Sequence, residues 1–327
     1  MKNKHKKPII ITAAALVCAA AVAVLFFISN RELFEPDIVV PWNPGGIADL
    51  TARALVPGSE IKNIPGANGA NGSNEVLNAP RDGKTALSTN LSAFVTSHML
   101  GFTETGHTGW EIWLTAYAPA VVAVRADSPY NTLPDLLNAD GKPRCANAGG
   151  GTMSYVAAYL FAEAAGIDVE HTAYSGSNPA VNAVAEGNAD FIIALSTELT
   201  AKLRSGELRA LASLSDADLQ LSGVPYSIPK ASDAVPALKN IAPFGEYYGM
   251  MMPKTTPRNA LRNCDALWVA AVKRESYGTF ADETGLLKLN AKRETKTANR
   301  MASIICWTLY DSGYVDISPE TAGIKRY

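Results

Sequence analysis

The sequence predicts an α/β fold, and three observations support this. Apolar, β-branched runs that suit buried strands alternate with segments whose apolar residues recur at helical spacing, the order expected of parallel sheets. Two glycine-rich turns, at 43–46 and 149–151, each follow a strand-like run and lead into a helix-like segment. The chain has 327 residues, which exceeds one typical domain, so we expect two.

Residues 1–30 are predicted to direct export. Four lysines lie among residues 2–7, and residues 8–28 are apolar apart from Thr12. This apolar stretch matches a membrane span of roughly 20 residues, and no clean small-residue cleavage site follows it. The segment is therefore a cleaved signal peptide or an N-terminal membrane anchor. In both cases the positive flank keeps the N-terminus in the cytoplasm, and we expect the rest of the chain to be periplasmic or extracytoplasmic.

The composition argues against nucleic-acid binding and leaves the state of the cysteines open. Without the four lysines of the export segment, the formal net charge falls from −2 to −6, which disfavours a nucleic-acid partner. Outside that segment the cysteines are Cys145, Cys264 and Cys306, an odd number without a C-x-x-C pair. Cys264 and Cys306 could form a disulfide in an oxidising compartment. The alternative is three buried thiols that pack as small hydrophobic groups.

The first strand, turn and helix form a candidate anion site. Residues 38–41 are predicted to be a strand and residues 48–55 a helix, joined by Trp42-Asn43-Pro44-Gly45-Gly46. The glycines allow positive φ and close approach of a ligand, and the helix start leaves N–H groups that favour a carboxylate or phosphate. The turn lacks both common nucleotide-binding glycine patterns, so nucleotide phosphates are not expected. The alternative is a tight turn with a structural role only.

Local patterns predict the remaining elements in chain order. Short apolar runs bounded by turn residues indicate strands, and apolar residues at helical spacing between capping residues indicate helices. Residues 225–243 are rich in proline and are expected to form a loop, and residues 276–292 follow no regular pattern. The expected strands are 85–89, 120–124, 169–174, 189–195, 209–215 and 246–253, with a short strand and turn at 59–65, and residues 142–148 lead into the second glycine turn; the expected helices are 71–78, 133–137, 155–165, 181–186, 255–274 and 295–311. For the helices at 71 and 255 we expect Asn, Ser or Thr side chains as N-caps, with Pro257 at the first helical position.

Polar side chains follow two predicted strands and the second glycine turn. Asn90 and Ser92 come after strand 85–89, and Ser196 and Glu198 after strand 189–195, where α/β folds place ligand-binding groups.

The turn at 149–151 contains Gly150 and precedes Thr152 and Ser154 at the start of a helix. Their hydroxyls are expected to face a ligand; the alternative is an N-cap pair without one.

Residues 37–53 resemble the opening of the solute receptors of tripartite tricarboxylate transporters, also called Bug receptors. The family pattern P-[FYW]-x-x-G-G-x-x-D-x-x-A-R is matched by Pro41, Trp42, Gly45, Gly46, Asp49, Ala52 and Arg53. Further blocks at 65–72, 79–85, 174–180 and 205–212 are similar to the family's sequences. Ser175 stands where the family often has lysine, and the chain is about a dozen residues shorter than the family between Arg53 and Pro65.

The resemblance implies a two-lobe fold like that of type II periplasmic binding proteins, with mainly parallel sheets and an interlobe cleft. Lobe 1 would comprise residues 34–124 plus 244–327, and lobe 2 residues 125–243. Two chain crossings between the lobes would form a hinge.

The function implied is capture of a small organic carboxylate, such as a di- or tricarboxylate, and its delivery to membrane transporter subunits. One carboxylate would bind N–H groups around residues 43–48 and the turn at 152–154. Neither glycine turn contains Arg or Lys, so backbone dipoles, hydroxyls and water would hold the anion. We expect Asp49 to orient its loop, and Glu198, if it faces the cleft, to repel a second carboxylate and favour an amine or amide.

The predicted ligand-binding residues come from both glycine turns, the two strand ends and the segment around residue 174. Trp42 or Tyr174 could cover the body of the ligand. The full set is Trp42, Asn43, Gly45, Gly46, Ala48, Asp49, Asn90, Ser92, Gly150, Thr152, Ser154, Tyr174, Ser177, Ser196 and Glu198.

The sequence offers no recognisable catalytic machinery. His98, His107 and His171 lack metal-spaced partners, and there is neither G-x-S-x-G nor H-E-x-x-H. We therefore expect a monomeric receptor without metal, cofactor or catalytic residues. Two alternatives remain: an anchored receptor that presents its ligand to a signalling partner, or an enzyme acting on a carboxylic acid with Asp49 or Glu198 as base.

Overall fold

A ten-stranded mixed sheet runs through the part of the chain that the structure describes, residues 34–326 of a computed structural model. The predicted export segment, residues 1–30, lies outside the described residues. Within residues 34–326, no helix is both long and apolar enough to span a bilayer.

The strands follow the order β2-β1-β3-β9-β4-β7-β5-β6, and β8 and β10 also pair with β4. Pairs among β1, β2 and β3, and among β5, β6 and β7, are parallel, whereas β4 and β9 pair antiparallel with their neighbours. The strands are β1 (Asp37–Val40), β2 (Ile61–Asn63), β3 (Thr85–Asn90), β4 (Trp110–Arg125), β5 (Arg144–Asn147), β6 (Glu170–Ala173), β7 (Phe191–Leu195), β8 (Leu208–Ser213), β9 (Gly245–Pro253) and β10 (Leu287–Lys292).

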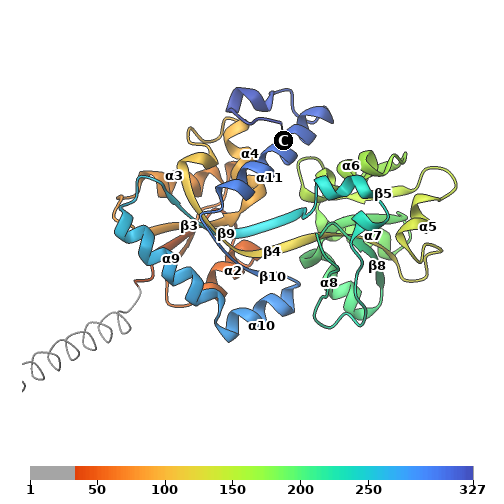
Figure 1. Ribbon diagram of the computed structural model, residues 1–327, viewed down its shortest axis with the longest axis horizontal. Helices are drawn as coiled ribbons and strands as arrows, with labels where there is room; N and C mark the ends of the chain where they lie inside the picture. The colour runs from red at the N-terminus through yellow and green to blue at the C-terminus, as the bar shows by residue number, and fades with distance from the viewer. Residues whose placement is uncertain (1–33, 327) are drawn as a thin grey trace, which may run out of the picture. The chain divides into compact units, whose positions relative to one another are not determined.

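Strand β4 connects two lobes. Its residues 110–119 pair with β9 in the first lobe, and its residues 120–125 pair with β7 and β8 in the second. Figure 1 shows β4 and β9 running side by side between the lobes. Alternate residues of β4 contribute to different hydrophobic clusters, Val122 and Val124 to one and Val121 and Ala123 to the other, as the two faces of a buried strand require.

Helices cover both faces of the sheet in each lobe, which buries strands that are apolar throughout. Helix α11 packs against α4 of the first lobe and also contacts α6 of the second. The α-helices are α2 (Ile47–Leu55), α3 (Ala70–Asn78), α4 (Leu91–Met99), α5 (Leu133–Leu137), α6 (Met153–Ala165), α7 (Ser177–Ala185), α8 (Ser196–Ser205), α9 (Arg258–Val272), α10 (Glu275–Thr284) and α11 (Thr295–Asp311).

Several sequence-based expectations about elements are wrong. Helices α4, α8 and α10 and strand β10 were not predicted. Helix α3 begins after Gly69 in the left-handed conformation, without a side-chain cap, and α9 begins after Pro257, which is its N-cap and not its first residue.

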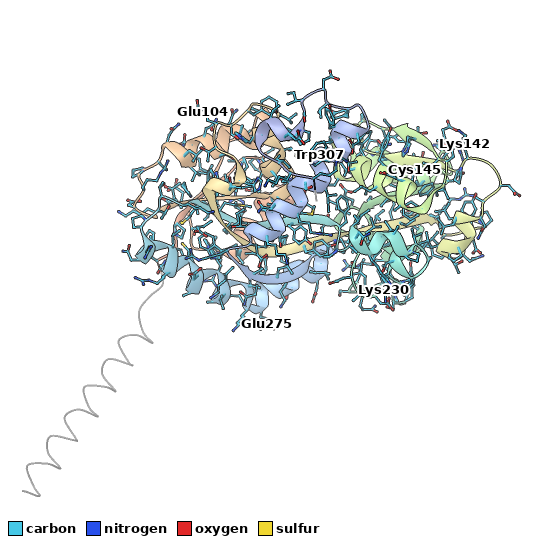
Figure 2. The ribbon with its side chains drawn as sticks, turned by 45° about the horizontal axis from the view of Figure 1, so that its top comes forward. Glu104, Lys142, Cys145, Lys230, Glu275 and Trp307 are labelled. Carbon is cyan, nitrogen blue, oxygen red and sulfur yellow. The ribbon has the colours of Figure 1, made fainter. Side chains whose placement is uncertain are left out.

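The three cysteines of the described region are free thiols, so Cys264 and Cys306 do not pair. All three are buried, and burial raises the pKa of each thiol, which keeps it protonated. The Sγ atom of Cys264 lies 3.5 Å from Sδ of Met252. Figure 2 shows Cys145 within the second lobe, while the charged Lys142 lies at its edge.

Candidate functional site

A cavity of about 300 Å³ lies between the lobes, at the ends of β3, β7 and β9. Its volume suits a small organic molecule. The lining residues from the first lobe are Trp42, Asn68, Asn90, Ser92, Ala93, Thr96, Glu246, Tyr248 and Ile305; those from the second are Gly151, Thr152, Met153, Ser177, Leu195 and Glu198.

The first wall of the cavity is built where β3 passes directly into α4. Asn90 ends the strand, and Ser92 lies in the first turn of the helix. Glu246 on β9 reaches this helix start: its Oε1 accepts from the main-chain N–H of Ser92 at 3.0 Å and of Tyr247 at 3.1 Å. Its Oε2 accepts from Asn90 Nδ2 at 3.1 Å and from the Ser92 hydroxyl. Glu246 thus fills the positive end of α4 with a carboxylate of the protein itself.

Glu246 is 3% exposed in an otherwise apolar strand. Burial raises the pKa of its carboxyl, and the hydrogen bonds from Ser92, Asn90 and Tyr247 oppose that rise. Four donors occupy the four lone-pair positions of the two oxygens, which leaves no position for a proton. The geometry therefore favours the ionised form.

The second wall is built where β7 passes directly into α8. Glu198, in the first turn of α8, accepts the main-chain N–H of Leu195 at 3.0 Å through Oε2. Its Oε1 accepts the hydroxyl of Ser177, the first residue of α7, at 2.5 Å. Burial raises the pKa of the Glu198 carboxyl, and these two hydrogen bonds oppose the rise. Each Glu198 oxygen keeps one lone pair without a protein partner.

The start of α6 lines the cavity with Gly151, Thr152 and Met153. Thr152 caps this helix by accepting the N–H of Tyr155 at 3.3 Å. In the described part of the chain, no hydrogen bond involves the main-chain N–H of Met153 or Ser154. The Ser154 hydroxyl itself accepts from Ala148 N at 2.8 Å and is turned into the protein. A helix of 13 residues therefore presents open donors and its positive end to this site.

Tyr248 lies between the two acidic walls. It lines the cavity and is 4% exposed, yet no described residue hydrogen-bonds to its hydroxyl. Burial raises its pKa well above the usual value, and the nearby charges of Glu246 and Glu198 raise it further. The phenol is therefore protonated at neutral pH and has an unused donor.

The first glycine turn is held by Asp49 and lies outside this cavity. Asp49 accepts the N–H of Gly45 at 2.9 Å, Arg53 Nε at 3.0 Å and Asn63 Nδ2 at 2.9 Å. Burial opposes ionisation of Asp49, but these contacts outweigh it and lower its pKa. Asn43 and Gly46 are exposed beside it. Asp49 thus fixes the shape of the turn.

The structure brings six of the predicted residues together around the cavity: Trp42, Asn90, Ser92, Thr152, Ser177 and Glu198. The other nine do not line it: Asn43, Gly45, Gly46, Ala48, Asp49, Gly150, Ser154, Tyr174 and Ser196. A role for them in ligand binding stays a prediction.

Sequence reasoning missed Glu246 and Tyr248, which line the cavity from the buried strand β9. The available signal was Glu246 itself, because a carboxylate is rarely buried without a specific partner.

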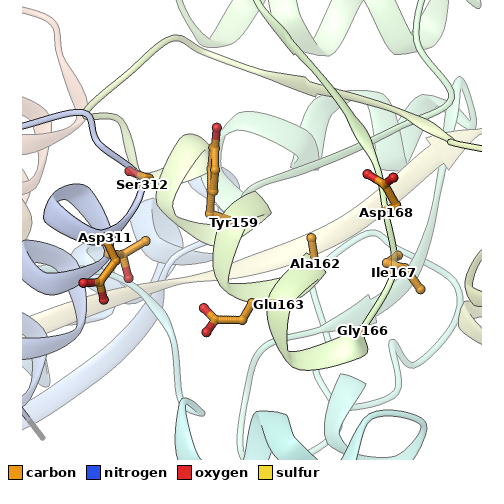
Figure 3. Close-up of a pocket in the computed structure, with 9 residues that line it drawn as sticks. Tyr159, Ala162, Glu163, Gly166, Ile167, Asp168, Asp311 and Ser312 are labelled. Carbon is orange, nitrogen blue, oxygen red and sulfur yellow. The ribbon is translucent and has the colours of Figure 1, made fainter.

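A second hollow, of about 650 Å³, lies between α6 and α11 (Figure 3). It is lined by Glu163, Asp168 and Asp311, which are surface groups. Asp311 pairs with Arg326 at 2.7 and 2.9 Å, and Asp168 pairs with Lys142. These partners already neutralise the charge, and no strand ends there, so we place the site in the interlobe cavity.

No group of three or more His, Cys, Asp or Glu side chains within residues 34–326 is arranged to hold a metal ion. His98 contacts the carbonyl oxygen of Thr103 at 2.8 Å and His107 contacts Asn299 Oδ1 at 2.8 Å. His171 stacks on Tyr159.

Residues 47–302 match the family model described as the tripartite tricarboxylate transporter family receptor, TctC. The chain belongs to this family. The resemblance found in the sequence is thereby confirmed, and the protein is a TctC-family periplasmic solute-binding receptor. It is 31% identical to the UPF0065 protein of the tcbD-tcbE intergenic region of Pseudomonas sp. strain P51, over 70% of each chain.

Solved structures agree with this assignment. A TctC solute-binding protein from Polaromonas is 25% identical with a TM-score of 0.73, and the match covers 86% of this chain and 98% of that one. R. palustris Rpa4515, solved with adipate, is 19% identical with a TM-score of 0.65, over 91% of this chain and all of that one. The two-lobe fold of periplasmic binding proteins is thus confirmed.

Proposed function

We propose that this receptor captures a small organic carboxylate in the interlobe cavity and delivers it, outside the cytoplasm, to a membrane transporter of the tripartite tricarboxylate type. The observation that carries the proposal is the cavity itself: both lobes line it, and one lining residue is Met153, at the start of α6, whose main-chain N–H has no hydrogen-bond partner among the described residues. Oriented N–H groups at a helix start are suited to a carboxylate. The adipate complex of a relative with the same fold supports this ligand class.

The lobe boundaries remain a proposal: residues 34–124 with 244–327, and residues 125–243. On this division the chain crosses between lobes in β4 and again shortly before β9. Because ligand contacts come from both lobes, binding would favour the closed arrangement, and the transporter would recognise that arrangement.

Thermal unfolding of the purified protein with a panel of mono-, di- and tricarboxylates and amino acids tests the proposal. A ligand at about 100 times its Kd should stabilise the protein by about 2.7 kcal/mol and raise the melting temperature. Ser177 is partly exposed at a helix start, so Ser177→Trp should fill the cavity and abolish the rise, while it also removes the hydroxyl that donates to Glu198.

The matched control is Ser205→Trp, at the exposed end of α8, which should respond to the ligand as the unmodified protein does. If no acid in the panel raises the melting temperature, the proposed function is wrong. If Ser177→Trp still responds fully, the site lies elsewhere, and the predicted turn at residues 43–48 becomes the next place to test.

A further inference from the structure

The hydroxyl groups of Ser92, Ser177 and Thr152 at the cavity can accept hydrogen bonds from a ligand but cannot donate to it, unlike the hydroxyl of Tyr248. The single proton of Ser92 Oγ is donated to Glu246, and that of Ser177 Oγ is donated to Glu198. Both hydrogens of the Asn90 amide are used as well, by Ser92 Oγ at 3.0 Å and Glu246 Oε2 at 3.1 Å. Thr152 Oγ1 donates to Gly149 O at 2.7 Å. What these groups have left for a ligand is lone pairs.

The two glutamates differ in what they can offer. Glu246 accepts four hydrogen bonds and is saturated, so it acts as a fixed charge that positions Ser92 and Asn90. Glu198 accepts two and retains one lone pair on each oxygen. Glu198 is therefore the carboxylate that can bind a ligand donor directly.

No positive side chain balances these acids at the cavity. None of the fifteen described residues that line it is Arg, Lys or His. The start of α8 offsets part of the Glu198 charge through its dipole. A ligand with two carboxylates would place its second negative charge near Glu198 and Glu246.

Two sides of the cavity therefore require opposite ligand chemistry. The α6 side has open N–H donors and a positive helix end, which suit a carboxylate. The Ser177 and Glu198 side has acceptors and a negative charge, which suit a charged donor. Tyr248 lines the same cavity, and its hydroxyl is available to donate a hydrogen bond to a polar group of the ligand.

We propose that the ligand is a small zwitterion with one carboxylate and one ammonium group, an amino monocarboxylic acid, with its ammonium group on Glu198. This proposal rests on the proposed function, because the carboxylate end uses the same cavity. It narrows the expected ligand class from di- and tricarboxylates to amino acids without a second negative charge.

Sets of ligands that differ only at one end test the proposal by calorimetry on the purified protein. The first set is 4-aminobutanoate, pentanoate and pentanedioate, which share a carboxylate and three CH2 groups and carry ammonium, methyl and carboxylate, respectively, at the other end. The α-amino set is each neutral amino acid with its deaminated counterpart. At least one amino member should bind at least about tenfold more tightly than its isosteres, the ratio equivalent to about 1.4 kcal/mol.

The isosteric variant Glu198→Gln should reduce binding of that amino member at least about tenfold and should leave binding of its deaminated counterpart unchanged or stronger. Gln can keep the local contacts, with its oxygen accepting from Leu195 N and its amide donating to Ser177 Oγ. Glu163→Gln, on the exposed face of α6 in the second hollow, is the matched control and should change nothing.

The outcomes separate this inference from the proposed function. If a dicarboxylate or a deaminated acid binds as tightly as every amino member, the zwitterion proposal is overturned while the receptor assignment stands. Unchanged binding of the amino member in Glu198→Gln overturns it as well. If no acid of any class binds, the proposed function fails, and this inference fails with it.

Discussion

At the residue scale, the site is organised by two glutamates with different hydrogen bonding, the buried Glu246 and the half-buried Glu198. Glu246 is saturated by four donors, while Glu198 has two. The same substitution, Glu to Gln, should therefore have opposite effects on the stability of the ligand-free protein at the two positions.

Glu246→Gln should destabilise the protein by roughly 1–3 kcal/mol, since the new amide cannot accept and leaves buried donors without partners. If the amide replaces Oε1, the N–H groups of Ser92 and Tyr247 lose their acceptor. If it replaces Oε2, the Asn90 amide and the Ser92 hydroxyl lose theirs. Urea unfolding measures the change. Unaltered stability would mean that Glu246 is protonated and only weakly bound in the native protein.

Glu198→Gln should raise the melting temperature of the ligand-free protein at neutral pH, because it removes a charge that burial disfavours. The pKa of the Glu198 carboxyl is higher in the folded protein than in the unfolded chain, where it is near 4.5. The contribution of Glu198 to stability is therefore fully present below that pH and is lost as the pH rises through the folded pKa.

Melting temperatures of Glu198→Gln and of the unmodified protein, measured from below pH 4.5 to neutral pH, test the direction of this pH dependence. The difference between Glu198→Gln and the unmodified protein should grow as the pH rises above about 4.5 and then level off. A difference that shrinks with rising pH contradicts the burial argument. Glu163→Gln, at an exposed position, should give curves that superimpose on those of the unmodified protein.

At the element scale, the second glycine turn is shaped by a contact from the C-terminal segment. A Cβ on Gly150 would lie 2.0, 2.6 and 2.8 Å from ring atoms of Tyr314, closer than such atoms can approach. Tyr314 also packs against Tyr155 in α6. The glycine is needed at this position for the close approach of an aromatic ring, which links the segment after α11 to the turn before α6.

Gly150→Ala should lower the free energy of unfolding by about 1 kcal/mol, at the low end of overpacking effects. The effect should be small because Tyr314 is half-exposed and can move away. In a Tyr314→Ala background the same substitution should have almost no cost. A double-mutant cycle by urea unfolding measures this coupling. Equal costs in both backgrounds would show that the turn needs glycine for a reason other than Tyr314.

The elements found from sequence are those with clear periodicity and boundaries. Helices at 133–137 and 295–311 were predicted with the bounds the structure has. Helix α4 was missed because nearly all its residues are buried, which removes the polar face that reveals a helix. Strand β10 was missed although its exposure alternates residue by residue, so the signal was present and was overlooked.

For the site, the sequence identified polar groups on both walls but not the pairing of Ser92 and Asn90 with Glu246. Ser92 and Glu198 follow strand ends and could be predicted from that position. Glu246 lies 154 residues from Ser92, in a strand whose neighbours in sequence are all buried, and only the folded sheet brings the two together. Long-range pairing of this kind leaves no local pattern to read.

At the scale of the whole described region, both lobes use β4, so unfolding of either lobe removes pairing partners from a strand that the other lobe also uses. Loss of β7 and β8 would remove the partners of residues 120–125, and loss of β9 those of residues 110–119. We therefore expect one cooperative unfolding transition for the two lobes.

The positions of the tryptophans allow a direct test of whether the two lobes unfold together. All five tryptophans lie at positions 42, 110, 113, 268 and 307, outside residues 125–243. Tryptophan fluorescence thus reports the first lobe, while far-ultraviolet circular dichroism reports both. The two urea transitions should coincide at the same midpoint. Separate midpoints would mean that the second lobe unfolds on its own and that the shared strand does not couple the lobes.

The carboxylate of Glu246 also bears on how receptors of this architecture diverge. It occupies the place where an anion from solution would otherwise meet the N–H of Ser92 and the amide of Asn90. In this protein, the Glu246 carboxylate therefore fills that position as part of the cavity wall. Replacing Glu246 by alanine would leave the Ser92 N–H and the Asn90 amide open to the cavity. A single substitution would then change a receptor with one place for a carboxylate into a receptor with two.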